Sequence, residues 1–236
     1  MYQKAIAYVA LMTIGTVPVQ PGVAQAPAPT AGSMAQAAGA AEYTIVIKSR
    51  WTKANFPVDY PPSGLLTSPH HSGVIGASHN SAYFIFKAGT MPTPGLERLS
   101  EEGKHSPLDA EIKAAIGGGT ALTLFESGAL RDFKDSIVTS VKVNDQFTLI
   151  DFVMMIAPSP DWFAGLTNVD LRENGAWTKT RTIDIYAWDS GGDDGDTYLA
   201  PDKDNNPKKP TMQAMNKQFL EGGKPGVIAT VTFTRK

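Results

Sequence analysis

Three segments alternate apolar and polar residues and predict strands with one buried face. In each segment, apolar residues occupy every second position and would therefore lie on one face of a strand. The segments are residues 43–48 (YTIVIK), 182–188 (TIDIYAW) and 227–234 (VIATVTFT). Because successive side chains of a strand point to opposite faces, this period of two is typical of a strand that covers a core on one side. Clusters of Gly, Pro, Asn and Ser separate the segments, as expected for turns between strands.

Two further apolar segments lack this alternation. Residues 146–156 (QFTLIDFVMMI) are apolar on both faces apart from Thr148 and Asp151, which predicts a central strand covered on both sides. Residues 82–88 (AYFIFKA) are rich in aromatic side chains and lie between polar turn residues, so we predict a strand here too. The strand over 146–156 therefore needs a packed layer against each of its faces.

Helical signals are few. The strongest covers residues 106–118 (SPLDAEIKAAIGG), with Ser106 as the predicted N-cap, Pro107 at the first helical position and Asp109 at the third. The glycines at its end predict where the helix stops. Together with the strands, the pattern predicts a mainly β protein, a single antiparallel β-sandwich domain with short helices in its loops.

The N-terminal segment has a different pattern and predicts a Sec-type signal peptide. An apolar run at residues 5–17 follows Lys4, and A-x-A sites occur at 24–26 and 35–37. We assign residues 1–37 to the signal peptide and an Ala/Pro-rich linker, and residues 38–236 to the folded domain. The run is short for a membrane span. The protein is then secreted or periplasmic, whereas a disordered N-terminal tail is the alternative.

Composition narrows the range of functions. The chain of 236 residues is 42% hydrophobic and 19% charged, with a formal net charge of −2. This is enough apolar material for a core, and it gives no electrostatic sign of a nucleic-acid partner. The chain has no cysteine, which excludes disulfides, thiol nucleophiles and cysteine-based metal sites. An exported domain of this kind depends on core burial or a bound metal for its stability.

Aspartates gather at two places that a β-sandwich could bring together. Asp161 follows the buried strand in a Pro-Ser-Pro-Asp turn, whereas Asp189 ends a predicted strand and Asp193 follows it through Ser-Gly-Gly. Calcium binds six to eight oxygen ligands and accepts carboxylates from well-separated loops. These three residues are therefore candidate calcium ligands. A solvated Asp/Gly turn is the alternative, and the spacing is not that of an EF-hand.

Other chemistry has weaker support. The four histidines (His70, His71, His79 and His105) show no metal-binding spacing, and side chains of this type often form hydrogen bonds in turns. There is no G-x-S-x-G element and no phosphate-binding glycine loop after a strand.

A pair of acids for glycoside hydrolysis stays open, because any two aspartates could lie at the required separation, but nothing singles out such a pair. The four tryptophans are interpreted as core residues in preference to an aromatic ligand-binding surface. We expect a protein that is not an enzyme.

Several motifs resemble the spondin domain, the N-terminal module of F-spondin and mindin. FVMMIAPSPDWFAGL (152–166) is similar to an apolar strand, a Pro-Ser-Pro-Asp-Trp turn and a Gly-Leu of that family. WDSGGD (188–193) and TYLAP (197–201) resemble the motifs that follow. RWTKANFPVDYPP (50–62) and HHSGVIGASHNSAY (70–83) resemble segments near the start of the domain. In order, these blocks span most of the domain from about residue 43 to 201.

The resemblance implies a C2-like β-sandwich with one Ca²⁺ held by Asp161, Asp189 and Asp193. It further implies a stand-alone domain of bacterial type, because this chain lacks the cysteines and additional modules of the animal relatives. The expected function is adhesion or extracellular recognition of a protein, glycan or surface ligand that the motifs do not identify. The main alternative is a calcium-dependent membrane- or glycan-binding module, with Lys208 and Lys209 as contact residues. A secreted hydrolase is the less favoured one.

Overall fold

The computed structural model describes residues 39–64, 68–130 and 136–236. The predicted signal peptide and linker, residues 1–37, lie outside the described residues. The longer strands are β1 (Ala40–Ser49), β3 (Ile75–His79), β4 (Ala121–Glu126), β5 (Ile137–Asn144), β6 (Leu149–Ala157), β7 (Trp162–Asp170), β10 (Thr180–Asp189) and β14 (Ala229–Arg235). Six two-residue strands are β2 (His70–His71), β8 (Arg172–Glu173), β9 (Ala176–Trp177), β11 (Met212–Gln213), β12 (Leu220–Glu221) and β13 (Lys224–Pro225). The helices are α1 (Pro94–Glu102), α2 (Leu108–Gly117) and the 3₁₀ turn η1 (Lys217–Phe219).

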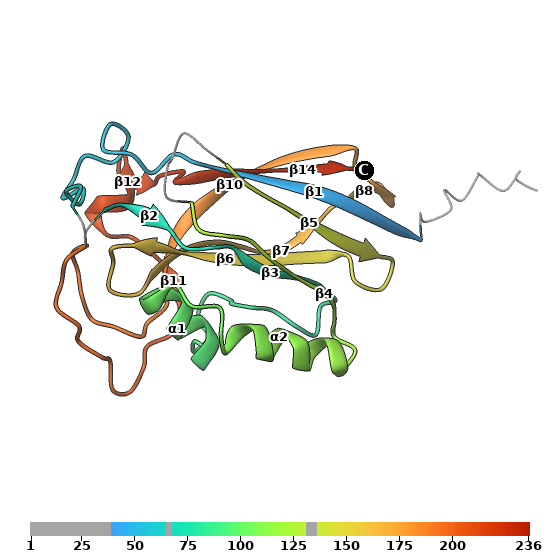
Figure 1. Ribbon diagram of the computed structural model, residues 1–236, viewed down its shortest axis with the longest axis horizontal. Helices are drawn as coiled ribbons and strands as arrows, with labels where there is room; N and C mark the ends of the chain where they lie inside the picture. The colour runs from blue at the N-terminus through green and yellow to red at the C-terminus, as the bar shows by residue number, and fades with distance from the viewer. Residues whose placement is uncertain (1–38, 65–67, 131–135) are drawn as a thin grey trace, which may run out of the picture. The chain divides into compact units, whose positions relative to one another are not determined.

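The longer strands form one antiparallel path in the order β4-β3-β6-β7-β10-β14-β1-β5. Figure 1 shows that this path makes two layers, with β10, β14, β1 and β5 in one and β4, β3, β6 and β7 in the other. Strand β10 joins them, because its first six residues pair with β14 and its last four residues pair with β7. The predicted antiparallel β-sandwich is therefore confirmed. The passage of β10 between the layers brings its end, Asp189, to the start of β7.

The two ends of the path, β4 and β5, lie beside each other. Two threonine hydroxyls join them, since Thr139 Oγ1 donates to the carbonyl of Glu126 (3.1 Å) and Thr123 Oγ1 donates to that of Lys142 (3.3 Å). Among the described residues, β4 and β5 do not pair through backbone hydrogen bonds. The threonine side chains therefore connect the two terminal strands of the path.

Two apolar cores flank the central strands. The larger core lies between the two layers and contains Trp51, Trp162 and Trp177, as the sequence predicted for tryptophans. The smaller core lies between the sheet and helices α1 and α2, which cover the outer face of β6 and its neighbours (Figure 1). Eight of the nine residues of β6 are buried, which confirms the prediction of a strand covered on both sides.

The expected strand over residues 82–88 is wrong. In the structure this segment is a loop in which two consecutive side chains, Ile85 and Phe86, both enter the smaller core. Its backbone groups bond to side chains in place of a neighbouring strand: Ile85 N donates to Asp151 Oδ2 (2.8 Å), and the carbonyl of Phe86 accepts from Thr167 Oγ1 (3.0 Å). Apolar composition alone suggested a strand, but these side-chain partners satisfy the backbone of a loop.

The helix predicted over residues 106–118 is present as α2, with a later start than expected. Pro107 occupies the N-cap position and no side chain caps the helix, so the assignment of Ser106 as N-cap is wrong. Helix α1 was not predicted, although Thr93 caps it and Pro94 opens it. Residues 201–210 form a mostly exposed loop.

Candidate metal centre

Asp161 lies in the turn between β6 and β7 and is fully buried. Its Oδ2 accepts three hydrogen bonds, from Ser190 Oγ (2.9 Å), Gly192 N (2.8 Å) and Asp193 N (3.2 Å). Its Oδ1 is shielded from solvent and has no hydrogen-bond partner in the described structure. Burial raises the pKa of this carboxyl group, although the bonds to Oδ2 act in the opposite direction.

Asp189 lies beside Asp161 because the end of β10 pairs with the start of β7, where Asp189 is opposite Trp162. Its Oδ1 accepts from Gly191 N (2.9 Å). Burial raises the pKa of Asp189 to about 6, and the charge of Asp161 adds to the shift. The structure therefore brings two of the three predicted ligands together. The charge of Lys209 lowers the pKa of Asp189 but does not outweigh these effects, so a bound cation would favour the ionised form of both carboxylates.

Asp193 contributes to the same loop through its backbone, while its carboxylate has other contacts. Its N–H donates to Asp161, as described above, but its Oδ1 accepts from Gly195 N (2.6 Å) and its Oδ2 accepts from Lys203 N. A carboxylate has about four acceptor positions, so these bonds leave room for further coordination. Its role as a ligand stays a prediction.

Glu101, near the end of α1, is an acidic side chain that the sequence did not single out. A Cβ atom added at Gly192 would lie 2.5 Å from Glu101 Oε1, and Gly192 is the residue whose N–H donates to Asp161. Glu101 Oε1 is shielded from solvent and has no hydrogen-bond partner in the described residues. Burial, followed by the charge of Glu97, raises its pKa to about 7, and Asp161 adds a smaller contribution. No sequence signal identified Glu101, since its place depends on the packing of the unpredicted helix α1.

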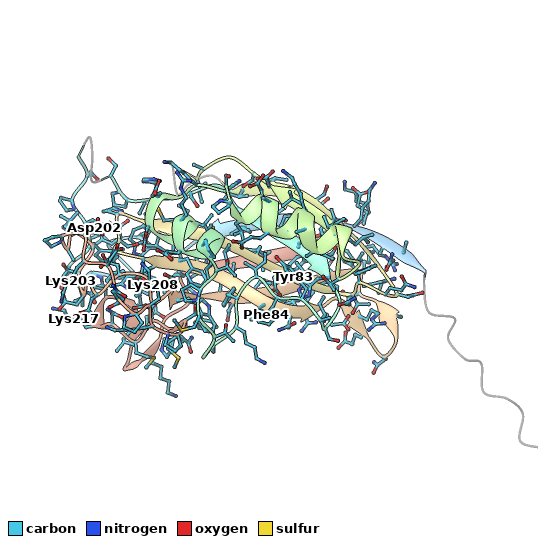
Figure 2. All side chains as sticks on the ribbon, turned by 90° about the horizontal axis from the view of Figure 1, so that it is seen from below. Tyr83, Phe84, Asp202, Lys203, Lys208 and Lys217 are labelled. Atoms are coloured by element: carbon cyan, nitrogen blue, oxygen red, sulfur yellow. The ribbon has the colours of Figure 1, made fainter. Side chains whose placement is uncertain are left out.

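A second acidic group adjoins the first. Among the residues that the structure describes, Glu97, Glu101 and Asp204 form the one group of three acids whose ligand atoms all lie within 4.8 Å. Asp161, Asp189 and Asp193 do not form so close a group. The second group already has a positively charged side chain beside it, because Lys208 Nζ lies 2.7 Å from Glu97 Oε1 and 3.4 Å from Asp204 Oδ1. Figure 2 shows Lys208 at the same end of the domain as Asp202, Lys203 and Lys217.

The remaining aspartate of interest, Asp194, has a different environment. Its carboxylate pairs with Lys203 Nζ (2.9 Å) and with Lys209 Nζ, and these bonds lower its pKa to about 2. Asp194 is therefore a surface ion-pair residue, with its charge matched by lysines.

The buried histidines have structural partners. His79 Nε2 lies 2.9 Å from Asp151 Oδ1 with both side chains fully buried. His71 Nε2 lies 2.9 Å from Ser49 Oγ, and burial lowers the pKa of His71 to about 4. The sequence predicted hydrogen-bonded histidines in turns; His71 and His79 have such polar partners, but they lie in strands β2 and β3.

The chemistry of the main group fits a hard divalent cation. Asp161, Asp189 and Glu101 supply oxygen ligands from three separate elements, and two of their oxygen atoms are shielded without a partner. Calcium prefers oxygen ligands of this kind, and a cation would lower the pKa of each carboxyl group. Among the described residues, Asp161, Asp189 and Glu101 do not form a group whose ligand atoms all lie within 4.8 Å, so calcium binding stays a prediction, with Glu101 as an additional candidate ligand.

Comparison with known proteins supports the resemblance noted in the motifs. The family model Spondin_N matches residues 41–222, which covers the sandwich and the loops that carry the acidic side chains. The chain belongs to the spondin family. Because the match includes α1 as well as β6, β7 and β10, all the candidate ligands lie inside the spondin domain.

Relatives of this spondin domain are found in several animals. Human Spondin-2 is 32% identical over 174 residues, which cover 72% of this chain and 51% of that protein. Spondin-1 of Xenopus laevis is 30% identical over 180 residues (73% of this chain, 21% of that protein), and chicken Spondin-1 is 27% identical over 213 residues (84% and 26%). The chain thus spans about half the length of Spondin-2 and a smaller part of Spondin-1. In its described portion, no helix has the length and apolar composition needed to cross a membrane.

Proposed function

We propose that this spondin domain is an exported calcium-binding β-sandwich that acts in adhesion or extracellular recognition and is not an enzyme. The observation that carries the proposal is the buried carboxylate of Asp161, whose Oδ1 has no partner in the described structure. A buried charge without a partner is costly, and a cation shared with Asp189 and Glu101 would remove that cost. The family resemblance supports Asp193 as a further ligand.

The proposed role of the ion is to brace loops. Asp161 bonds to the Ser190–Asp193 segment, Asp189 ends β10, and Glu101 belongs to α1. One ion would therefore join three elements that otherwise repel one another electrostatically. Because Asp161 has no exposed surface, a substrate could not reach its carboxylate, which favours a structural role over a catalytic one.

A cavity beside Glu101 offers a place for a recognised ligand. Its volume is about 470 Å³, and its lining includes His70, Glu101, Tyr198 and Leu199. Leu199 is 53% exposed at this cavity, whereas Tyr198 is buried beneath it. Ligand pockets of proteins commonly have volumes of about 300–1,000 Å³. A recognition role is consistent with this size and with the mixed apolar and polar lining.

The alternative of a calcium-dependent membrane module receives less support. Lys208 and Lys209, the expected contact residues, are engaged with Glu97 and Asp194 respectively. Their charges are thus balanced within the domain, and attraction to an anionic lipid surface would have to come from other residues. We therefore keep recognition of an extracellular ligand as the proposed function.

Thermal unfolding with Ca²⁺ and with a chelator tests the proposal. With Ca²⁺ at about 100 times its dissociation constant, binding to the folded state should add about 2.7 kcal/mol of stability. The substitutions Asp161→Asn and Glu101→Gln remove one negative charge each with little change in shape. We expect Asp161→Asn to lose the response to Ca²⁺ and Glu101→Gln to weaken it.

Asp202→Asn is the matched control, because it removes an exposed acidic charge from the same end of the domain (Figure 2). It should respond to Ca²⁺ as the unmodified protein does. Equal melting temperatures with Ca²⁺ and with chelator in the unmodified protein would refute the calcium site. A response that survives Asp161→Asn would place the ion elsewhere.

A further inference from the structure

A polar cavity lies at the end of the domain opposite the acidic loops. Its volume is about 330 Å³, and its lining consists of Arg172, Glu173, Thr178, Thr180 and Arg181. Figure 1 shows β8, which carries the first two of these residues, near the C-terminus and far from the loop that joins β10 to β11. The cavity is therefore separate from the candidate metal centre.

The β8–β9 hairpin fixes the position of Arg172. Asn174 and Gly175 turn the hairpin with positive φ angles of 52° and 79°, which suit a tight two-residue connection. Arg172 Nη2 lies 2.9 Å from Asp170 Oδ2, and its guanidinium carbon lies 5.9 Å from the centre of the Trp177 ring. Both contacts hold the guanidinium group at the edge of the cavity.

Two more arginines at this end, Arg181 and Arg235, form no ion pair with an acid among the described residues. Arg181 Nη1 donates to the backbone carbonyl of Asp170, and Arg235 Nη1 donates to that of Trp177 (3.3 Å). A carbonyl oxygen orients a guanidinium group but does not neutralise it. Arg235 N also donates to the carbonyl of Lys179 (2.9 Å), which places a further basic residue on the adjoining segment.

The local charge differs in sign from that of the whole chain. Arg172, Lys179, Arg181 and Arg235 contribute four positive charges, against the acids Asp170 and Glu173. One more acid, Asp145, acts on Arg172 through its charge and still leaves positive charge in excess. The chain as a whole has a net charge of −2. A polyanion that binds this protein would therefore be directed to a local site and not attracted by the overall charge.

We propose that this cavity binds an anionic polysaccharide through its sulfate or carboxylate groups. Guanidinium groups present N–H donors in a planar fork that matches such oxyanions. Thr180 is an exposed lining residue and adds a hydroxyl that can bond to a sugar. The site is independent of calcium, since none of its residues belongs to the acidic loops. It would give the domain a second contact with an extracellular surface.

Binding of a heparin oligosaccharide to the full-length protein tests this proposal. Titration calorimetry in the presence of chelator and about 50 mM NaCl should show binding that weakens as salt increases. The double substitution Arg181→Gln/Arg235→Gln should weaken binding at least tenfold. Arg98→Gln/Lys113→Gln is the matched control: it removes two positive charges from α1 and α2, where both residues are paired with acids. The control should change the affinity less than twofold.

A desulfated oligosaccharide and inorganic sulfate separate the sources of the anion. The desulfated sugar should bind more weakly than heparin, and inorganic sulfate should compete only at concentrations far above that of the oligosaccharide. Competition by inorganic sulfate at concentrations similar to that of the oligosaccharide would overturn the assignment to a polysaccharide. Absence of heparin binding, or equal weakening by the two double substitutions, would overturn the site. Because chelator is present throughout, either result is distinct from a failure of the calcium proposal.

Discussion

Asp151 and Asp161 are both fully buried; Asp151 lies within β6 and Asp161 lies just after it. They differ in whether both carboxylate oxygen atoms have partners. Asp151 Oδ1 faces His79 Nε2 at 2.9 Å, and its Oδ2 accepts from Ile85 N (2.8 Å) and Thr167 Oγ1 (3.2 Å). Asp161 Oδ2 also accepts several bonds, but its Oδ1 accepts none in the described structure. Both oxygen atoms of Asp151 therefore have partners within the chain, whereas Asp161 has no positively charged partner in the described structure.

The difference shows that burial alone does not identify a ligand-binding acid. Asp151 is as inaccessible as Asp161, and its bonds join β6 to the loop that carries Ile85. Its partners satisfy it, so it acts as a structural residue. The unpartnered oxygen atom is the informative feature, because a buried acceptor without a donor costs free energy that a bound cation can recover.

Loss of Asp151 should have the largest effect on stability. Asp151→Ala leaves His79 buried without its carboxylate and removes the side-chain acceptor for Ile85 N. Removing one partner of a buried ion pair lowers the free energy of unfolding by about 3–5 kcal/mol. Urea denaturation in chelator should show this loss, and a smaller one for Asp161→Ala, because the latter also relieves repulsion among the acids. Equal losses would contradict the contrast between the two residues.

The second-largest effect should be a difference between variants of Asp151 and Asp161 in their stabilisation by Ca²⁺. Asp151→Asn should keep the gain of about 2.7 kcal/mol at 100 times the dissociation constant, although it starts from a lower stability. Asp161→Asn should gain nothing. Paired urea curves with Ca²⁺ and with chelator measure both differences. A gain that is lost in Asp151→Asn as well would mean that the loss reflects general damage to the fold.

The pH dependence of the calcium-free protein should reveal the unpartnered acids. Their pKa values are raised on folding, to about 6 for Asp189 and about 7 for Glu101, so the folded state binds more protons than the unfolded state between these values and about pH 4. Stability should therefore fall as pH rises through this window. Calcium should abolish the fall, because it favours the ionised carboxylates. His79 and His71 titrate with and without calcium, so the difference between the two melting profiles isolates the acids.

The smallest effect is expected for an exposed acid that lies outside the surroundings of both Asp151 and Asp161. Asp202→Asn should change the free energy of unfolding by less than about 0.5 kcal/mol at neutral pH, with or without calcium. Urea denaturation checks this value. A larger change that appears only with Ca²⁺ would add Asp202 to the site and widen the proposed set of ligands.

The sequence predicted those features that depend on local pattern. Alternation placed β1, β10 and β14, and the apolar segment at 146–156 identified β6 as covered on both faces. The aspartates at the ends of β6 and β10 were recognised because turns and strand ends have local signals. Asp161 and Asp189 meet as expected, since β10 pairs with β7.

Features that depend on distant partners were missed. The loop at 82–88 looked like a strand because its bond to Asp151 spans 66 positions in the chain. Glu101 gained its place only when α1 packed against the sheet near Gly192. The carboxylate of Asp193 bonds to Lys203 N, ten residues away, which spacing within the Asp/Gly segment did not indicate. Each of these misses involves a contact made by tertiary packing.

The seam between β4 and β5 has a consequence for solubility. Unpaired strand edges present backbone donors and acceptors that can recruit strands from other molecules and start aggregation. Here each terminal strand of the path lies against the other, and the hydroxyls of Thr123 and Thr139 occupy carbonyls that would otherwise be open. Replacing these threonines by valine would free those carbonyls. In a chain without disulfides, this seam covers both terminal strands of the folded domain and so protects them against association with other molecules.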